Sequence, residues 1–458
     1  MKTIFLMFWA NWDLAKKKLF PALYNIYKNN FTENLDIVWI GRRDYTRQDF
    51  IDYIKKESKP YLSDEDSSED FFSELKYSKL DLTQEEDYYN LKKYIQNLDD
   101  WDSQIIIYLS ISPEYYFDFI ENSKILDLKE NVKIIFEKPF GTDLNSAKEL
   151  ESKIKEVFSE EQTYIIDHYV GKEPIQNILT FRFANILFEP IWNSNYIDNI
   201  QISATEEIWV GTRWAYYEKS WALRDMVQNH LMQMIALVAM DAPAKLDSDS
   251  ISAEKLKILK SINLGKDFNN KIVFGQYEWY KQETWVDPNS RVETFVAMKL
   301  EIENYRFKWV PIYLKTWKAL DKKSTKIVIN FKKLPSIFKE FWEICENRII
   351  LEVQPNEWIS IHFNIKEEWN AKSVKRVHSI FKKELNSKEA YQKLIEDVIV
   401  WDKSLFTSFD ILKESWKIVD DIINCKDDCP IIYEYKKWTK WPQQSDELLK
   451  NEWREWYE

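Results

Sequence analysis

The chain has 458 residues, which is more than one ordinary domain holds and enough for two. Hydrophobic residues make up 45% of it and charged residues 31%, as in globular proteins that fold in water. The formal net charge of -12 argues against a general nucleic-acid binder and against a protein that binds acidic membranes. An anionic ligand would therefore need a local basic pocket.

The chain has three cysteines: Cys345, Cys425 and Cys429. An odd, sparse set gives no disulfide framework and no metal-type spacing, so we expect a cytoplasmic protein without a bound metal. Lys2 and the apolar run Thr3–Ala10 faintly resemble a signal peptide, but the run is short and Lys16–Lys18 follow it without a cleavage site. We predict a buried strand there instead. No stretch approaches transmembrane length, so we expect no membrane contact.

Glycine and tryptophan occur in abnormal numbers. The chain has 6 glycines and 21 tryptophans. Ordinary usage of about 7% would give roughly 30 glycines in a chain of this size. Turns with positive φ depend on glycine, so these numbers suggest that tryptophan stands in for glycine at many positions.

The first third of the sequence alternates between apolar strands and amphipathic helices. Helix-like segments are Leu14–Lys28 and Leu144–Val157, whereas acidic Asp64–Asp70 is typical of a solvated loop. Such alternation predicts an α/β domain, a Rossmann-like, doubly wound parallel sheet. The strand candidates are Thr3–Phe8, Asp36–Ile40, Ile105–Ile111, Val132–Phe136 and Tyr164–Asp167.

The pattern changes beyond residue 170. Trp221–Met240 has the apolar spacing of one long helix. Later segments alternate with period two, which predicts strands of a large, mainly antiparallel sheet with one covered face. We therefore expect an α+β domain over residues 171–458, after a cofactor-binding domain over residues 1–170. The period-two segments are Phe295–Ile302, Lys326–Phe331, Ile349–Gln354 and Ile359–Ile365.

The opening strand–turn–helix, Phe8–Ala15, is the layout that binds a dinucleotide pyrophosphate through backbone N–H groups. A close backbone approach is needed, yet two indoles stand in the turn. An ordinary strand–helix connection explains the segment equally well. The residues expected to contact a cofactor are Trp9, Asn11, Trp12, Asp13 and Leu14.

Two arginines, Arg42 and Arg43, follow the second strand. An NAD enzyme presents an acid to the ribose 2′-hydroxyl at this point, whereas arginine suits the 2′-phosphate of NADP. A solvated basic pair is the alternative.

Polar clusters follow two further strands. The phrases are "FEKPFGTDL" (136–144) and "DHYVGKE" (167–173). Open α/β sheets bind ligands at this edge, and the second cluster offers donors for an anion. The alternative is a charged helix start.

His230 borders the buried stripe of the long helix, in "ALRDMVQNHLMQM" (222–234). A buried core histidine is the ordinary explanation, but Asp225 and Asn229 favour a polar cleft. A carboxylate that orients a histidine makes it a general base. The sequence alone does not show that Asp167 reaches His230.

Taken together, these stretches resemble the glucose-6-phosphate dehydrogenase family over essentially the whole chain. Several phrases occur in the family's order: "EKPFGTDLNSAKEL", "DHYVGKE", "RDMVQNHLMQ", "ETFVAMKLEIEN", "VQPNEWISIHFN" and "EAYQKLIEDVIVWD". One such phrase would be weak, but so many in register are highly specific.

The chain departs from this family in one repeated way. Tryptophan stands where relatives usually carry glycine: at 9, 12, 39, 209, 214, 221, 309, 317, 358, 401, 438 and 441. Trp192 and Trp416, by contrast, match tryptophans of the family. We hypothesise that a codon decoded as glycine in the source organism has been translated here as tryptophan. The literal chain is then expected to bind nicotinamide cofactor poorly, because indoles fill the space of the phosphate.

The resemblance implies oxidation of D-glucose 6-phosphate with NADP, or NAD, in the pentose phosphate pathway. It implies that His230 is the general base and that Asp167 orients it. Arg42 would bind the 2′-phosphate, Lys138 would contact both substrate and cofactor, and the chain would form a homodimer or homotetramer. The implied substrate residues are Lys138, His168, Tyr169, Lys172, Glu206, Asp225 and Lys318.

Two alternatives remain at this point. Another Rossmann-type sugar oxidoreductase could share the Glu-Lys-Pro motif. A non-catalytic homologue would follow if Trp9 and Trp12 were genuine.

Overall fold

The structure is a computed structural model that describes residues 2–9, 12–62, 68–99, 103–128, 130–206, 214–283, 286–318, 323–334, 344–368, 373–382, 389–428, 431–437 and 441–457. The described residues form two compact units. Unit 1 lies within Met1–Gly171, Leu246–Asp249 and Lys388–Phe409. Unit 2 lies within Lys172–Lys245, Ser250–Ser387 and Asp410–Glu458. Sequence periodicity gives no sign that the two later segments pack with the first unit.

Unit 1 is built on a six-stranded sheet in the order β3-β2-β1-β4-β5-β6, with every neighbouring pair parallel. The predicted Rossmann-like sheet is therefore confirmed. The short strand β3 has half-buried residues and no continuous apolar run, so the sequence pattern missed it. The strands are β1 (Thr3–Trp9), β2 (Leu35–Gly41), β3 (Lys76–Lys79), β4 (Gln104–Ser110), β5 (Val132–Phe136) and β6 (Thr163–Ile165).

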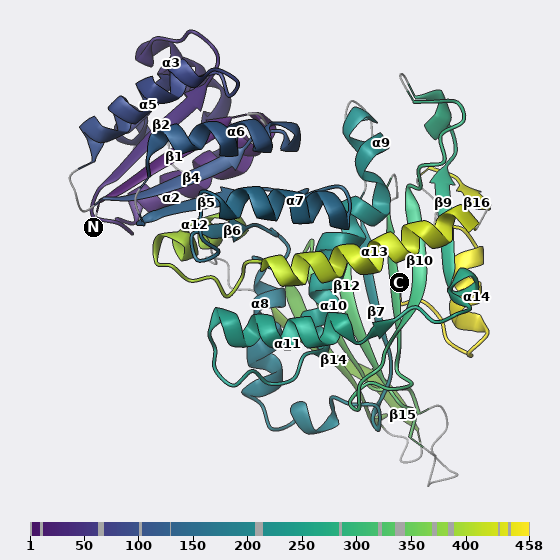
Figure 1. Cartoon of the computed structure of the whole chain (residues 1–458). Helices are drawn as coiled ribbons and strands as arrows, with labels where there is room; N and C mark the ends of the chain where they lie inside the picture. Colours follow the sequence, from purple (N-terminus) through teal and green to yellow (C-terminus); the bar gives the residue numbers. More distant parts are fainter. Residues whose placement is uncertain are drawn as a thin grey trace. The chain divides into compact units, whose positions relative to one another are not determined.

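Helices cover both faces of this sheet, as the buried side chains require. On one face Phe20 stacks on Trp39, with ring centroids 5.1 Å apart. On the other face Phe8 meets Phe119 edge to face at 4.9 Å, and Figure 1 shows α5 and α6 crossing the strands. The helices are α1 (Trp12–Leu14), the π-helix η1 (Ala15–Leu19), α2 (Phe20–Lys28), α3 (Arg47–Ser58), η2 (Lys59–Tyr61), α4 (Ser68–Glu74), α5 (Glu85–Leu98), η3 (Pro113–Tyr115), α6 (Tyr116–Ser123), η4 (Lys124–Leu126), α7 (Leu144–Lys155) and α12 (Ala390–Ile399).

The prediction of a loop over Asp64–Asp70 is wrong at the C-terminal end of that range. Helix α4 begins at Ser68, and Phe71 and Phe72 on it are fully buried. Burial of two aromatic rings outweighs the local polarity of the sequence. Residues 63–67 lie outside the described part of the chain.

Unit 2 contains a ten-stranded sheet. Nine strands follow the order β15-β14-β13-β12-β7-β11-β10-β9-β16, and β8 pairs with β10. Most pairs are antiparallel, as predicted, but β7–β11 and β9–β16 are parallel. The strands are β7 (Ile197–Thr205), β8 (Ile262–Asn263), β9 (Ile272–Tyr277), β10 (Phe295–Ile302), β11 (Pro311–Trp317), β12 (Ser324–Phe331), β13 (Arg348–Gln354), β14 (Trp358–Lys366), β15 (Val374–Lys382) and β16 (Ile432–Tyr435).

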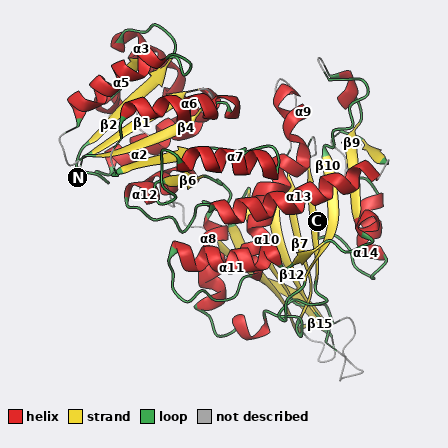
Figure 2. Cartoon of the chain, in the orientation of Figure 1, coloured by secondary structure: helices red, strands yellow, loops and turns green. Residues whose placement is uncertain are grey.

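Helices α8, α10, α11 and α13 lie over one face of this sheet (Figure 2). Unit 2 thus buries an amphipathic sheet under a helical layer, as α+β folds do. The helices are α8 (Glu173–Phe183), η5 (Glu189–Ile191), α9 (Trp214–Ala222), the π-helix η7 (Leu223–Leu231), α10 (Met232–Ala239), α11 (Ser248–Lys260), η8 (Phe268–Lys271), η9 (Tyr280–Gln282), α13 (Phe409–Asp428) and α14 (Gln444–Lys450).

The long helix predicted over Trp221–Met240 requires a correction. Trp221 has φ 29 and ψ 179, so the chain is not helical there. The π-helix η7 follows and continues directly into α10. A π-helix has i→i+5 hydrogen bonds, and an apolar stripe that fits the α-helical period does not reveal them.

Five tryptophans of the described residues have positive φ: Trp221 (29°), Trp279 (75°), Trp309 (68°), Trp401 (64°) and Trp453 (60°). Left-handed backbone costs an L-residue roughly 1–2 kcal/mol, and only glycine adopts it freely. Three of these indoles, at 279, 309 and 453, are 68%, 82% and 98% exposed, so burial does not offset the cost. The backbone therefore favours glycine at these positions. Two of them, 279 and 453, are not among the glycine positions that the family resemblance implies.

Candidate active site

The carboxyl edge of the parallel sheet in unit 1 contains a cavity of about 460 Å³. Phe8 and Gly41 line it from the ends of β1 and β2, and exposed Arg42 and Arg43 line it from the following loop. Arg43 donates a hydrogen bond to the Tyr45 hydroxyl at 2.9 Å. The cavity therefore presents two guanidinium groups, with the Asp81 carboxyl group among its lining, at the place where the sequence predicted a phosphate.

The opening strand–turn–helix has the predicted layout, since β1 ends at Trp9 and α1 begins at Trp12. The predicted cofactor residue Asn11 lies outside the described residues. Asp13 forms ion pairs with Lys16 and Lys17 at 3.3 and 3.4 Å. Leu14 is half-buried and packs against the core of unit 1.

Glu137 and Lys138 follow β5, and Asp167 and His168 lie just beyond β6, so both pairs lie at the same sheet edge. The Glu137 carboxylate accepts a hydrogen bond from the Tyr108 hydroxyl. Desolvation raises the pKa of Glu137, although its hydrogen bonds oppose the shift. This carboxyl group is therefore held in place directly beside Lys138.

Asp167 and His168 are fixed by local contacts. Asp167 is only 3% exposed, and its Oδ1 accepts the backbone N–H of Tyr169 at 2.9 Å. The His168 ring lies 4.8 Å from the Tyr169 ring, and it is nearly parallel to the Tyr391 ring at 6.3 Å. Tyr391, on α12, was not predicted as a site residue. The only sequence signal for it was the family-like phrase that contains it.

In unit 2, Glu206 and Lys318 follow the parallel neighbours β7 and β11. The Lys318 ammonium contacts the Glu206 carboxylate and lies 3.2 Å from Asp225 Oδ2. The Lys318 side chain is only 7% exposed. This buried cation holds two carboxylates at one place, which suits the recognition of sugar hydroxyls.

Asp225 and His230 lie on the π-helix η7 and are 8% and 0% exposed. Residues five apart are about 140° apart on an α-helix, but an i→i+5 helix brings them to one face. Asn229, the other polar residue of the predicted cleft, donates its side-chain amide to the Arg224 carbonyl at 3.3 Å. The π-helix therefore gives Asp225 and His230 a common face.

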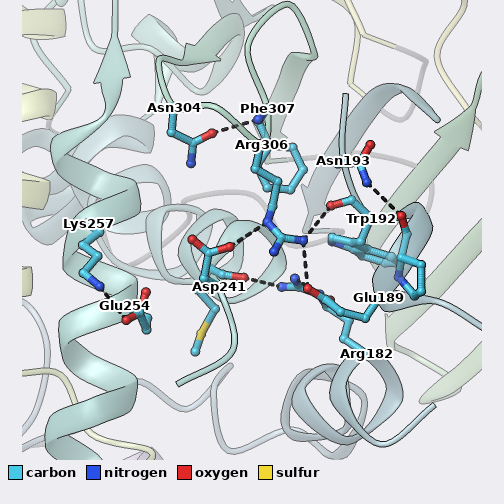
Figure 3. A network of polar contacts seen from close by, with 12 residues as sticks. Arg182, Glu189, Trp192, Asn193, Asp241, Glu254, Lys257, Asn304, Arg306 and Phe307 are labelled. Carbon is cyan, nitrogen blue, oxygen red and sulfur yellow. Dashed lines mark hydrogen bonds and ion pairs between the residues drawn. The ribbon is translucent and has the colours of Figure 1, made fainter. Parts of the chain in front are cut away.

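The far end of this helical segment is held by Arg182, which is fully buried (Figure 3). Its guanidinium donates to the Val238 carbonyl at 2.9 Å and pairs with Glu189 at 3.0 Å. Arg306 binds the same Glu189 carboxylate at 2.8 Å. Trp192 also donates to the Val238 carbonyl, at 2.8 Å, so this tryptophan has a structural role.

Lys172 precedes α8 and forms an ion pair with Glu357 at 2.8 Å. A larger hollow of about 1460 Å³ in unit 2 is lined by Asn193, Tyr305, Trp309 and neighbouring residues. It contains none of the predicted site residues. Asp167 and His230 lie in different units, so their pairing stays a prediction.

Fold and site together define a class of protein. A Rossmann-like sheet with a basic cavity at its carboxyl edge, joined to a large α+β unit with a buried Lys–carboxylate cluster, is the architecture of an NAD(P)-dependent oxidoreductase. Sequence profiles identify the family within this class. The profile of the glucose-6-phosphate dehydrogenase NAD-binding domain matches residues 6–177, and the profile of its C-terminal domain matches residues 179–457. The chain belongs to the glucose-6-phosphate dehydrogenase family.

Individual relatives agree with the profiles. Glucose-6-phosphate 1-dehydrogenase of Bacillus subtilis is 36% identical over 100% of this chain and 98% of its own length. The enzyme of Borreliella burgdorferi is 38% identical over 98% and 97%. A solved glucose-6-phosphate dehydrogenase in complex with glucose 6-phosphate superposes with a TM-score of 0.91 at 29% identity, covering 100% of this chain and 99% of that one.

None of the helices in the described part of the chain is both long and apolar enough to span a membrane.

Proposed function

We propose that this protein oxidises D-glucose 6-phosphate to 6-phospho-D-glucono-1,5-lactone and reduces NADP to NADPH. The observation that carries the proposal is fully buried His230 on the same π-helical face as Asp225, whose carboxylate binds Lys318. A buried polar constellation of this kind suits a sugar and a proton-transfer base. Family membership supplies the substrate.

His230 is the general base in this proposal. It takes the proton of the C1 hydroxyl, and NADP, when bound, accepts the hydride from C1. The Asp167 carboxylate orients the imidazole and stabilises its charged form. The hydrogen bond that Asp167 accepts from Tyr169 N–H supports this role, because it fixes the carboxylate.

The remaining predicted residues bind substrate. His168, Tyr169 and Lys172 provide donors for the dianionic phosphate, which an acidic protein must bind through local cations. Glu206, Asp225 and Lys318 bind the sugar hydroxyls. Lys138 contacts both substrate and cofactor.

The preference for NADP rests on Arg42. Arg42 and Arg43, in the cavity at the end of β2, offer two positive charges to a 2′-phosphate, against the one negative charge of Asp81 in the same lining. Asp44, which would repel that phosphate, forms an ion pair with Lys79 at 3.2 Å. The residues present therefore suit NADP better than NAD.

In the protein that the source organism makes, we propose glycine at positions 9 and 12. Glycine lets the turn bring backbone N–H groups against the pyrophosphate of NADP. The five tryptophans with positive φ support this substitution pattern from elsewhere in the chain.

The test is an assay of the glycine-restored chain, which has glycine at every position assigned to it: 9, 12, 39, 209, 214, 221, 279, 309, 317, 358, 401, 438, 441 and 453. We expect NADPH formation with glucose 6-phosphate, and little with glucose or other sugar phosphates. Oxidation of a different sugar would favour the alternative oxidoreductase. Micromolar NADP binding by the literal chain would contradict the proposed role of the turn.

Assembly into a homodimer or homotetramer is also proposed. Two apolar side chains of the hairpin β14–β15, Phe363 and Phe381, are 38% and 58% exposed, which supports burial against a second copy. Analytical ultracentrifugation would measure the mass. A cytoplasmic location is also proposed, because the sequence has only three cysteines, an odd and sparse set that gives no disulfide framework.

A further inference from the structure

The π-helix that carries Asp225 and His230 begins abruptly. The chain has non-helical backbone at Trp221, and the helix starts directly after it. The first backbone N–H groups of any helix lack partners within the helix, so a buried helix start needs acceptors from elsewhere.

One residue supplies two of these acceptors. The Glu293 backbone carbonyl accepts the N–H of Ala222 at 3.4 Å, and its side-chain Oε1 accepts the N–H of Leu223 at 3.1 Å. Glu293 is 0% exposed. Its carbonyl also accepts the Tyr217 hydroxyl of α9 at 3.2 Å, so both helices that meet at residue 221 are attached to it.

Glu293 is itself attached to the sheet of unit 2. Its neighbour Thr294 donates its N–H to the Gly275 carbonyl at 2.8 Å, and its hydroxyl lies 2.8 Å from that of Tyr435. The Thr294 carbonyl accepts the N–H of Lys318 at 3.0 Å. Two adjacent residues thus hold the start of the site helix and the backbone of the site lysine.

We infer that Glu293 is a positioning residue for glucose 6-phosphate oxidation, because its carboxylate fixes where the helix with Asp225 and His230 begins. It touches neither substrate nor cofactor in this account. A helix displaced by about 1 Å would misplace the base and a sugar ligand together, and such a displacement can cost about 100-fold in rate. The inference rests on the proposed roles of Asp225 and His230.

The test compares Glu293→Ala with Glu293→Gln in the glycine-restored chain. We expect Glu293→Ala to lower kcat/KM for glucose 6-phosphate about 10- to 100-fold, through both kcat and KM. KM for NADP should change by less than about twofold, because unit 1 binds the cofactor. Glutamine keeps the acceptor oxygen, so Glu293→Gln should recover most of the loss.

Glu452→Ala is the matched control. Glu452 is an ion-paired carboxylate of unit 2, and it accepts the Tyr313 hydroxyl at 2.6 Å. Its removal should lower thermal stability without a selective change in KM for glucose 6-phosphate. If Glu452→Ala lowered kcat/KM for glucose 6-phosphate as much as Glu293→Ala does, general destabilisation would explain both results. That outcome would overturn the inference.

Amide hydrogen exchange provides a second readout that does not depend on activity. Peptides covering residues 222–231 should exchange faster in Glu293→Ala than in the parent chain, and at the parental rate in Glu293→Gln. Unchanged exchange in Glu293→Ala, or equal damage in both variants, would overturn the inference. If the parent failed to oxidise glucose 6-phosphate, the proposed function would fail, while the exchange result would still decide the role of Glu293 at the helix start.

Discussion

Tryptophans 309 and 453 have left-handed backbone and almost fully exposed indoles. Glycine at either position should raise stability by about 1 kcal/mol, because relief of roughly 1–2 kcal/mol of backbone strain exceeds the added entropy of the unfolded chain. Urea unfolding of Trp309→Gly and Trp453→Gly would measure this gain.

Trp192 is the matched control for this prediction. It is 1% exposed and donates to the Val238 carbonyl, so Trp192→Ala should cost about 3–5 kcal/mol. Equal losses at 192, 309 and 453 would contradict the assignment of glycine to the positive-φ positions.

Lys318 is the cation between Glu206 and Asp225. Lys318→Met should destabilise the fold by about 3 kcal/mol, because it leaves two carboxylates without their partner, and should weaken glucose 6-phosphate binding. Calorimetric titration with the sugar phosphate and urea unfolding would measure the two effects.

Lys299→Met serves as the control, because Lys299, on strand β10, pairs with Glu452, and neither is a predicted site residue. It should affect stability alone. Unaltered sugar binding in Lys318→Met would remove Lys318 from the site.

At the scale of elements, the hairpin β14–β15 contains His362 opposite His378, with ring centroids 5.2 Å apart. Burial, together with the charges of His378, Arg348 and Arg376, lowers the pKa of His362 to about 4. An unfolded histidine has a pKa of about 6.5, so between these values the unfolded chain binds more protons than the folded chain.

Stability should therefore fall as the pH drops from about 6.5 to about 4, and His362→Asn should reduce that dependence. Urea midpoints across this range would measure it, with the two proteins behaving alike above pH 7. If the stability of both proteins fell equally between about pH 6.5 and pH 4, His362 would not be held deprotonated in the folded state.

Sequence patterns predicted the exact bounds of some helices and strands and missed others entirely. Val132–Phe136 and Phe295–Ile302 have the predicted bounds, because a continuous apolar run and a period-two run are unambiguous. Lys76–Lys79 has no such pattern and was missed. The π-helix Leu223–Leu231 was predicted as α-helix, because the apolar stripe is compatible with both.

The site was predictable to a similar degree. Lys138 and Asp167 were predicted because they follow apolar strands, where open α/β sheets bind ligands, whereas Glu206 and Lys318 came only from the family resemblance. Tyr391, Arg182 and Glu293 were not predicted, since they act through packing partners distant along the chain. Hydrogen bonds across such separations leave no local pattern in the sequence.

At the scale of the whole molecule, glycine in place of tryptophan accounts for three observations together. They are the scarcity of glycine, the occurrence of tryptophan where relatives carry glycine, and the positive φ of five tryptophans. Mass spectrometry of the protein from its native host should find glycine at 221, 279, 309, 401 and 453, as well as at 9 and 12. Tryptophan should remain at 192 and 416. Tryptophan masses at the positive-φ positions would refute the codon hypothesis.

The central claim is oxidation of glucose 6-phosphate through His230. NADPH formation should therefore be followed for the glycine-restored chain, beside the same chain carrying His230→Asn. We predict rapid NADPH formation by the first and a kcat lower by about 10²- to 10⁴-fold in the second, with KM for NADP unchanged. No NADPH from the first protein, or equal rates from both, would contradict the account.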